Sequence, residues 1–381
     1  MLRAVIIVLL IISALPVFCQ EDSLNPIIRV CIIDDAKSIH LALKDGYAIY
    51  PLGSGNIILK GSKFGGSVKS VPGGLVIGKS ELRFPRIKIK VFVDSTIYVN
   101  GRSFRGSIDI AGKPNGNIMV INEIPMESYL CGVLYHEVSP KWPMEVLKAQ
   151  AIVARTFALY QMNERKADLF DVRNDIYSQV YGGSTSEKWT TNRAVNLTRG
   201  EVLAYNGKLF PAYYHATCGG ITEDAAALWS IVTPPLRGGV KCAFCKDSPH
   251  YKWHKAFSSN DLWWDLRKLG SKLKNIASIE ILSRTRSGRV DKMVLRDDLG
   301  AEYAISGKDF RQMAGPNIVR SLNFEASVRG EFIVLTGYGW GHGVGLCQWG
   351  ARGMSLAGHK AEDIIKHYYP QSEIVNIDKV R

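Results

Sequence analysis

The stretch IPMESYLCGVLYHEVSPKWPMEVLKAQAIVARTFALYQM, residues 124–162, decides the fold of this 381-residue chain. Its first half carries apolar side chains at three- and four-residue steps, the spacing of one face of a helix. These residues are Tyr129, Leu130, Val133, Leu134 and Val138. Because proline is favoured at a helix start and disfavoured inside a helix, Pro125 and Pro140 mark the ends of this predicted helix.

The second half of the stretch predicts another helix, which begins at Trp142-Pro143 and runs to about Met162. Its apolar stripe consists of Leu147, Ala151, Ala154 and Ala158. An amphipathic stripe of this kind must pack against another element. We therefore expect the two consecutive helices to form the core of a domain.

The residues outside this helical pair have other patterns. From Ile28 to about Val120, short alternating runs separated by Gly and Asn indicate strands joined by hairpin turns. Further on, residues 200–214 and 277–305 are strand-like, and residues 259–273 and 361–369 are helix-like. The predicted fold class is α+β, with a β-rich lobe over residues 20–118 and a mixed helix and strand domain over residues 119–381.

The chain begins with a continuously apolar segment, Met1 to Cys19, with Arg3 near its start. This segment reads as a secretory signal peptide that is cleaved after Cys19, and the alternative is an uncleaved membrane anchor. In either case we expect the body of the protein to work outside the cytoplasm, in the periplasm, in the cell wall or as a secreted protein.

The charge balance favours an anionic partner. Lys and Arg number 48 against 35 Asp and Glu, a formal net charge of +13. Without a DNA- or RNA-binding motif, this excess favours an acidic envelope, such as cell-wall polymer or lipid headgroups, over nucleic acid, and a generically basic surface is the other reading. The composition, 46% hydrophobic and 22% charged, excludes a disordered chain.

Glu137 is the most informative acid. It follows Leu130, Val133 and Leu134 at three- and four-residue steps, so its carboxyl projects from the apolar stripe of the predicted helix. Loss of solvent raises the pKa of a carboxyl and keeps it protonated near neutral pH, as a general acid requires. The alternative is an acid at the helix end that reaches water.

Arg155 lies on the second predicted helix among small apolar neighbours. Its guanidinium either orients a carboxylate or a sugar oxygen in a cleft, or forms a structural ion pair, for example with Glu137. Because the two helices are consecutive, we expect Glu137 and Arg155 to face one cleft.

Three cysteines in the second half of the chain are expected to cluster, namely Cys218, Cys242 and Cys245. The spacing of the last two, C-x-x-C, is that of a zinc knuckle, so a structural zinc is one interpretation. Outside the cytoplasm, a disulfide from Cys218 to one of the other two is the equal alternative.

Long stretches of the chain resemble the stage II sporulation protein D family, also called SpoIID/LytB. The segments that match its core are Pro125–Val138 and Trp142–Phe157, those that match its closing motif are Gly337–Met354 and His367–Pro370, and the match to its strand-lobe signature is Asn100–Gly106. The resemblance runs from about Ile28 to Ile377 in one order, and it identifies residues 119–381 as a SpoIID-like catalytic domain.

The resemblance implies cleavage of peptidoglycan glycan strands by lytic transglycosylation in cell-wall remodelling or sporulation-like processes, with Glu137 as the catalytic residue. No metal or other cofactor is required for such a reaction, because one carboxyl serves as acid and then as base. The family also includes modifiers of amidases, so the alternative is a non-catalytic wall-binding enhancer of an N-acetylmuramoyl-L-alanine amidase. The expected partners are therefore glycan strands and other wall hydrolases. A metal-dependent hydrolase built on His136, His215 and His342 is disfavoured, since no local histidine pair supports it.

His342 stands among glycines at positions 337, 339, 341 and 343, which let backbone approach a ligand closely. Gln348 and Trp349 follow, and an amide with an aromatic face suits the hydroxyls and the apolar ring face of a sugar. We expect all three side chains to bind substrate in the Glu137 cleft, and the alternative is a tight turn with a buried histidine.

Some members of the resembled family carry a His and two Cys as zinc ligands before a Gln-Val-Tyr motif. This chain keeps the motif at Gln179–Tyr181 but has Arg173 and Ser178 where the cysteines align. Neither residue binds zinc well, so we expect that zinc site to be absent.

Overall fold

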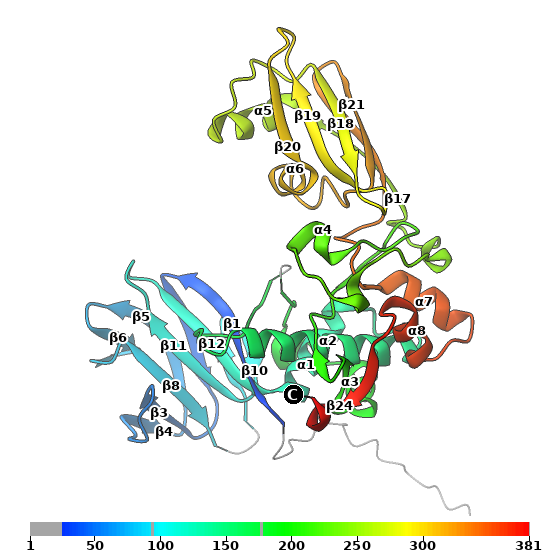
Figure 1. Ribbon diagram of the computed structural model, residues 1–381. Coiled ribbons are helices and arrows are strands. Elements are labelled where there is room, and N and C mark those ends of the chain that lie inside the picture. Colours follow the sequence, from blue (N-terminus) through cyan, green and yellow to red (C-terminus); the bar gives the residue numbers. More distant parts are fainter. Residues whose placement is uncertain (1–24, 93–94, 176–177, 381) are drawn as a thin grey trace, which may run out of the picture.

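The structure is a computed structural model that describes residues 25–92, 95–175 and 178–380 (Figure 1). It combines helices with several sheets, which confirms the predicted α+β class. The predicted signal segment, Met1–Cys19, lies outside the described residues. Within the part that is described, no helix has the length and apolar character needed to cross a membrane.

The N-terminal part is a lobe of two sheets that share one hydrophobic core. The first sheet has the spatial order β13 (Val172–Arg173), β1 (Ile27–Ala36), β12 (Ile118–Pro125), β11 (Ser107–Gly112), β8 (Arg86–Val91), β3 (Tyr47–Pro51) and β4 (Leu59–Gly61). The second has the order β10 (Arg102–Phe104), β9 (Ile97–Val99), β2 (Ser38–Leu43), β5 (Phe64–Val71), β6 (Gly74–Ile77) and β7 (Ser80–Leu82). Alternation places Leu41 and Leu43 of β2, and Ile87 and Ile89 of β8, in the core between the sheets.

The helical pair begins where the lobe ends. Strand β12 leads directly into α1 (Met126–Glu137), whose N-cap is Pro125, and α2 (Met144–Glu164) follows with Pro143 as its N-cap. The first helix ends before Pro140: its C-cap, Val138, has extended backbone with φ −139°. Glu137 is therefore the last residue of α1.

The lobe and the helical pair are packed together. Strand β1 runs antiparallel to β12 in the register Ile28↔Ile124, and side chains from both sheets join residues of α1 and α2 in one core. The predicted boundary between residues 118 and 119 stays a prediction, and it falls at a place where the two sides share this core.

The opposite face of α2 packs against a second core, which explains why this helix is buried on two sides. Around that core lie β14 (Glu201–Tyr205), β16 (Tyr214–His215), β23 (Leu346–Cys347), α7 (Gln348–Leu356), α8 (Ala361–Tyr368) and β24 (Glu373–Asn376). Strand β15 (Lys208–Leu209) pairs with β14. Shorter elements connect them: η1 (Gly183–Ser186), α3 (Trp189–Leu197), α4 (Ala225–Trp229), η2 (Pro234–Leu236), η3 (Ala243–Cys245) and η4 (Ile377–Lys379).

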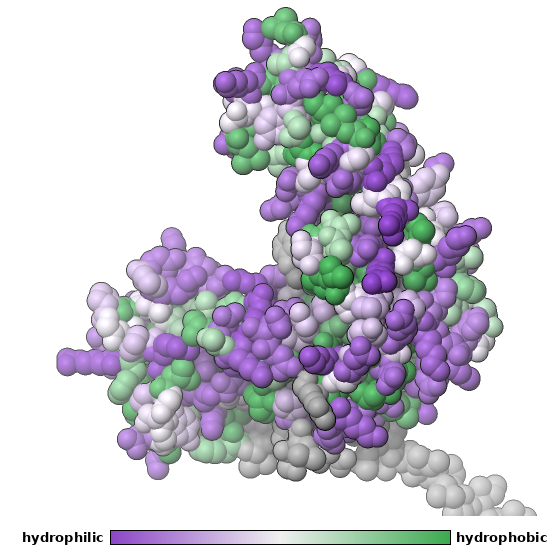
Figure 2. All heavy atoms as spheres, viewed as in Figure 1, coloured by the Kyte–Doolittle hydropathy of each residue, from purple (hydrophilic) through white to green (hydrophobic). Residues whose placement is uncertain are grey.

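Residues 252–338 form an upper unit with a hydrophobic core of its own. It contains β17 (Lys252–Ser258), α5 (Ser259–Lys268), β18 (Ser278–Arg284), β19 (Val290–Arg296), β20 (Glu302–Ser306), α6 (Gly307–Ala314), β21 (Phe324–Arg329) and β22 (Phe332–Tyr338). Figure 1 shows this unit, in yellow and orange, standing away from the lobe, and Figure 2 shows a broad notch between the two. The predicted domain 119–381 includes these residues without separating them.

Candidate functional site

Glu137 lies at the C-terminal end of α1 and is partly exposed. Its Oε1 accepts a hydrogen bond from the amide of Val180 at 3.3 Å, and its carboxylate accepts another from the hydroxyl of Tyr214. Burial of the carboxyl raises the pKa of Glu137 to about 7, and these two hydrogen bonds offset part of the rise. A carboxyl with this pKa can both give and take a proton near neutral pH.

A chain of hydrogen bonds fixes the position of Tyr214. The hydroxyl of Tyr129 donates to Oε1 of Gln179 at 3.0 Å, and Nε2 of Gln179 donates to the hydroxyl of Tyr214 at 3.2 Å. Burial, followed by the nearby Glu137 charge, holds the pKa values of both tyrosines well above their usual range. Both phenols therefore remain hydrogen-bond donors near neutral pH.

The loop that carries Gln179 and Val180 is anchored to the lobe through Tyr181. The Tyr181 hydroxyl donates to Oδ1 of Asn122 at 2.9 Å, and Nη2 of Arg102 donates to the Tyr181 carbonyl at 2.5 Å. A Cβ at Gly132 of α1 would lie 2.5 Å from the Tyr181 ring, so only glycine permits this close packing. Arg102, which belongs to the strand-lobe signature, thus helps to position the backbone amide of Val180 that contacts Glu137.

His342 is connected to the Glu137 site through Tyr214. Its Nδ1 accepts a hydrogen bond from the amide of Val344 at 3.1 Å, so the neutral ring carries its proton on Nε2, and the ring also bonds to the backbone of Tyr214. Burial and the neighbouring His215 hold the pKa of His342 well below its usual range. The residue as a whole is partly exposed, and its ring meets Trp229 edge-on, with 5.0 Å between ring centroids. His342 is therefore a neutral group that supports the strand carrying Tyr214.

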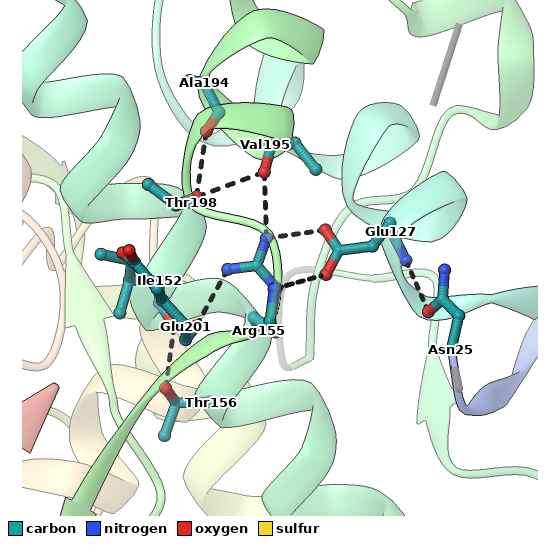
Figure 3. Close-up of polar contacts among 10 residues, drawn as sticks. Asn25, Glu127, Ile152, Arg155, Thr156, Ala194, Val195, Thr198 and Glu201 are labelled. Carbon is teal, nitrogen blue, oxygen red and sulfur yellow. Dashed lines mark hydrogen bonds and ion pairs between the residues drawn. The ribbon is translucent and has the colours of Figure 1, made fainter. Parts of the chain in front are cut away.

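Arg155 differs from the expectation that it faces a cleft with Glu137. Its side chain is fully buried, and its guanidinium forms a two-point ion pair with Glu127 at 2.8 and 2.7 Å (Figure 3). The same guanidinium donates to the carbonyls of Glu201 and Val195. The guanidinium thus forms its hydrogen bonds in the protein interior, and its ion pair with Glu127 links α2 to the start of α1. The structural ion pair is the correct alternative, with Glu127 as the partner in place of Glu137.

Gln348 and Trp349 begin α7 and have different surroundings. Gln348 is buried, and its Nε2 donates to Oε1 of Gln150 on α2 at 3.3 Å, so its amide faces the protein interior. Trp349 is partly exposed and packs edge-to-face with Trp142, with 5.3 Å between ring centroids. Because Trp142 lies in the connection that follows Glu137, this pair offers an aromatic surface close in sequence to the carboxyl.

The three predicted cysteines do cluster, and a fourth joins them. The Sγ atoms of Cys218, Cys242, Cys245 and Cys347 all lie within 4.8 Å of one another, and none of these thiols is in a disulfide. Among the described residues this is the one group of three or more His, Cys, Asp or Glu placed to hold a metal ion. The predicted disulfide is therefore not formed here, and Cys347 is the member that the sequence analysis missed.

The loop aligned with the zinc site of other family members is built differently. Nη1 of Arg173 pairs with Oδ2 of Asp34 at 2.7 Å, and the amide of Ser178 donates to Oδ1 of Asp175 at 3.1 Å. A guanidinium cannot ligate zinc, and a serine hydroxyl is a poor ligand, so these residues do not fit the ion.

Tyr129, Gln179 and Tyr214 are the site residues that sequence reasoning did not assign. Gln179 had a signal in the Gln-Val-Tyr motif, whereas Tyr214 is placed by the parallel pairing of β16 with β23 in the register Tyr214↔Leu346. A pairing between segments so distant in the chain has no local signal.

Comparison with known proteins settles the family. The stage II sporulation protein family model (SpoIID) matches residues 114–205, and a domain of unknown function (DUF8618) matches residues 242–345. Stage II sporulation protein D of Bacillus subtilis is 33% identical over 276 residues, which cover 68% of this chain and 76% of that protein. This chain belongs to the stage II sporulation protein D family.

Two further relatives are similar to this chain over much of its length. An uncharacterised protein of Brachyspira hyodysenteriae is 38% identical over 283 residues, covering 74% of this chain and 75% of that protein. The amidase enhancer of Bacillus subtilis is 29% identical over 295 residues, covering 65% of this chain and 40% of that protein. The predicted family membership is thus confirmed.

Proposed function

We propose that this SpoIID family member cleaves peptidoglycan glycan strands by lytic transglycosylation, with Glu137 as the catalytic residue. The observation that carries the proposal is Glu137, a partly exposed residue whose carboxyl has a pKa raised by burial to about 7 and is oriented by Tyr214 and Val180. These are the properties of a group that exchanges protons with a substrate near neutral pH.

The reaction has two proton transfers. Protonated Glu137 gives its proton to the glycosidic oxygen, and the bond between that oxygen and C1 of muramic acid breaks. The carboxylate then takes the proton of the 6-hydroxyl of the same sugar while O6 bonds to C1, which closes a 1,6-anhydro ring. The tethered hydroxyl has a high effective molarity, so no second carboxylate is needed to hold a water. Glu137 ends protonated, ready for another turnover.

The surroundings of Glu137 suggest how the strand is bound. The Tyr214 hydroxyl donates to the carboxylate formed after the first proton transfer and so stabilises it. We assign the aromatic surface of Trp142 and Trp349 to a sugar ring, and the partly exposed His342 to the same binding region. The net charge of +13 favours an anionic partner such as cell-wall polymer, and it supports the proposal that the protein works outside the cytoplasm.

A second candidate function is stimulation of a wall amidase without cleavage. It is favoured by the relative named amidase enhancer, which matches 65% of this chain. A protein of that kind would bind wall polymer through the same surfaces but would not depend on the Glu137 carboxyl.

Release of soluble fragments from peptide-free glycan strands distinguishes the two functions. We expect the wild-type protein to release fragments, and Glu137→Gln to lower the rate by about 10²-fold or more, the range of general acid and base catalysis, with strand binding retained. Glu164→Gln, which changes an exposed acid at the end of α2, is the matched control. Full activity in Glu137→Gln contradicts the proposal, and an inactive wild type that accelerates an amidase supports the second candidate.

A further inference from the structure

The four-cysteine cluster brings together three distant parts of the chain. Cys218 follows β16, Cys242 caps the start of η3 and Cys245 is its last residue, and Cys347 ends β23 and caps the N-terminus of α7. All four are buried, at 2% exposure or less. A close group of four buried cysteines without a disulfide among them is the arrangement expected of metal ligands.

The size of the cluster suits a tetrahedral metal ion. A zinc ion bound by four thiolates at about 2.3 Å has its sulfur atoms about 3.8 Å apart. Here the Sγ atoms of Cys218 and Cys245 are 3.6 Å apart, and all four Sγ atoms lie within 4.8 Å of one another. A disulfide would need about 2.05 Å between two of them.

Hydrogen-bond donors point at these sulfur atoms. The amides of Cys218 and Gly350 donate to Sγ of Cys347 at 3.2 and 3.3 Å, and the amide of Gly220 donates to Sγ of Cys218 at 3.4 Å. The Tyr368 hydroxyl lies 3.1 Å from Sγ of Cys242. Donors of this kind stabilise the negative charge of thiolate ligands and orient them around a metal.

The backbone is shaped for these contacts. Gly219 and Gly220 both have positive φ, 75° and 113°, which turns the amide of Gly220 back toward the sulfur of Cys218. A Cβ at Gly350 would lie 2.7 Å from Sγ of Cys242, so only glycine leaves the first turn of α7 open beside the cluster.

We propose that Cys218, Cys242, Cys245 and Cys347 bind one structural zinc ion that fastens the upper unit to the body of the protein. The upper unit, residues 252–338, begins shortly after Cys245 and ends shortly before Cys347. The four ligands therefore include residues on both sides of the unit in the sequence. Cys218 and the N-terminus of α7 belong to the core that covers α2. The buried guanidinium of Arg289, the residue just before β19, adds a contact across the same junction, since its Nη2 donates to the Cys218 carbonyl at 2.8 Å.

Metal analysis of the purified full-length protein tests this proposal. We expect one zinc per chain, and four cluster thiols that resist alkylation until a strong chelator and denaturant are added together. Iron in place of zinc, four reduced thiols without metal, or loss of free thiols to disulfides would each overturn the assignment. These measurements use the wild-type protein and do not depend on any variant folding.

Matched serine variants locate the ion. Cys347→Ser and Cys242→Ser should lose most of the zinc and lower the melting temperature, whereas Cys31→Ser, which changes a buried free cysteine in β1 outside the cluster, should keep a full equivalent. Zinc retained in both cluster variants, or lost in Cys31→Ser, would contradict the site. A chelator should lower the melting temperature of the wild type and leave that of the metal-free variants unchanged.

Discussion

The hydroxyl of Tyr214 donates a hydrogen bond to the carboxylate of Glu137, although the two residues belong to a short strand and to the end of a helix far apart in the chain. The bond stabilises the charged form of the acid and works against burial, which raises the pKa. Tyr214 therefore acts as a positioning residue that also sets the pH at which Glu137 changes charge.

Replacing Tyr214 by Phe should raise the pKa of Glu137 further. A hydrogen bond to a charged group contributes about 1.5–3 kcal/mol, so its loss should move the alkaline limb of the pH–activity profile upward by about one unit and lower the maximal rate about tenfold. Tyr98→Phe, on β9 in the lobe, is the control and should leave the profile unchanged. An identical profile in both variants would mean that the Tyr214 hydroxyl does not act on Glu137.

The raised pKa of Glu137 also predicts a pH-dependent stability. The folded protein holds this proton up to about pH 7, whereas the unfolded chain releases it near 4.5, so the carboxyl lowers stability progressively as pH rises from 4.5 to 7. Glu137→Gln removes this penalty, and the variant should gain on the order of 3 kcal/mol relative to wild type at pH 8 but much less at pH 5. Denaturant unfolding at both pH values measures the difference. An equal gain at pH 5 and pH 8 would argue against a raised pKa.

Arg155 should matter for folding rather than for catalysis. Its guanidinium is buried against the carboxylate of Glu127, so Arg155→Met leaves an unpaired buried charge and should cost about 3–5 kcal/mol of unfolding free energy. Arg83→Met, which alters an exposed arginine in the lobe, should cost little. A folded Arg155→Met protein with wild-type stability and no activity would instead favour a role in substrate binding.

His342 should influence the rate through Tyr214. His342→Ala removes the ring that bonds to the Tyr214 backbone and packs against Trp229, and we expect kcat/KM on glycan strands to fall about tenfold, the equivalent of about 1.4 kcal/mol. His40→Ala, at an exposed position of β2, provides the comparison. An unchanged rate in His342→Ala would separate this histidine from the site.

The sequence was most informative where local pattern and structure coincide. Helical spacing and two prolines predicted α1 and α2, and alternation predicted the strands of the lobe, because those signals depend on neighbours along the chain. The apolar stripe that ends in Glu137 predicted a desolvated carboxyl, in agreement with its raised pKa. The motif around Cys242 and Cys245 likewise predicted a cluster.

The features that the sequence did not predict depend on packing between residues far apart in the chain. Arg155 pairs with Glu127 because the start of α1, and not its end, lies beside Arg155. The spacing of apolar residues within each helix does not predict how two helices pack against each other. Cys347 joins the cluster through the pairing of β23 with β16, and it carries no C-x-x-C partner of its own to reveal it. The separate core of residues 252–338 was missed because its strands and helices have the same local texture as those around them.

Mass spectrometry of the digested strands tests the transglycosylase mechanism most directly. Peptide-free glycan strands are incubated with the wild-type protein and with Glu137→Gln, and the new ends are identified by mass. The mechanism predicts 1,6-anhydromuramic acid ends, lighter by one water than reducing ends, with wild type and none with Glu137→Gln. Reducing ends formed by addition of water, or anhydro ends produced equally by the Gln variant, would contradict it.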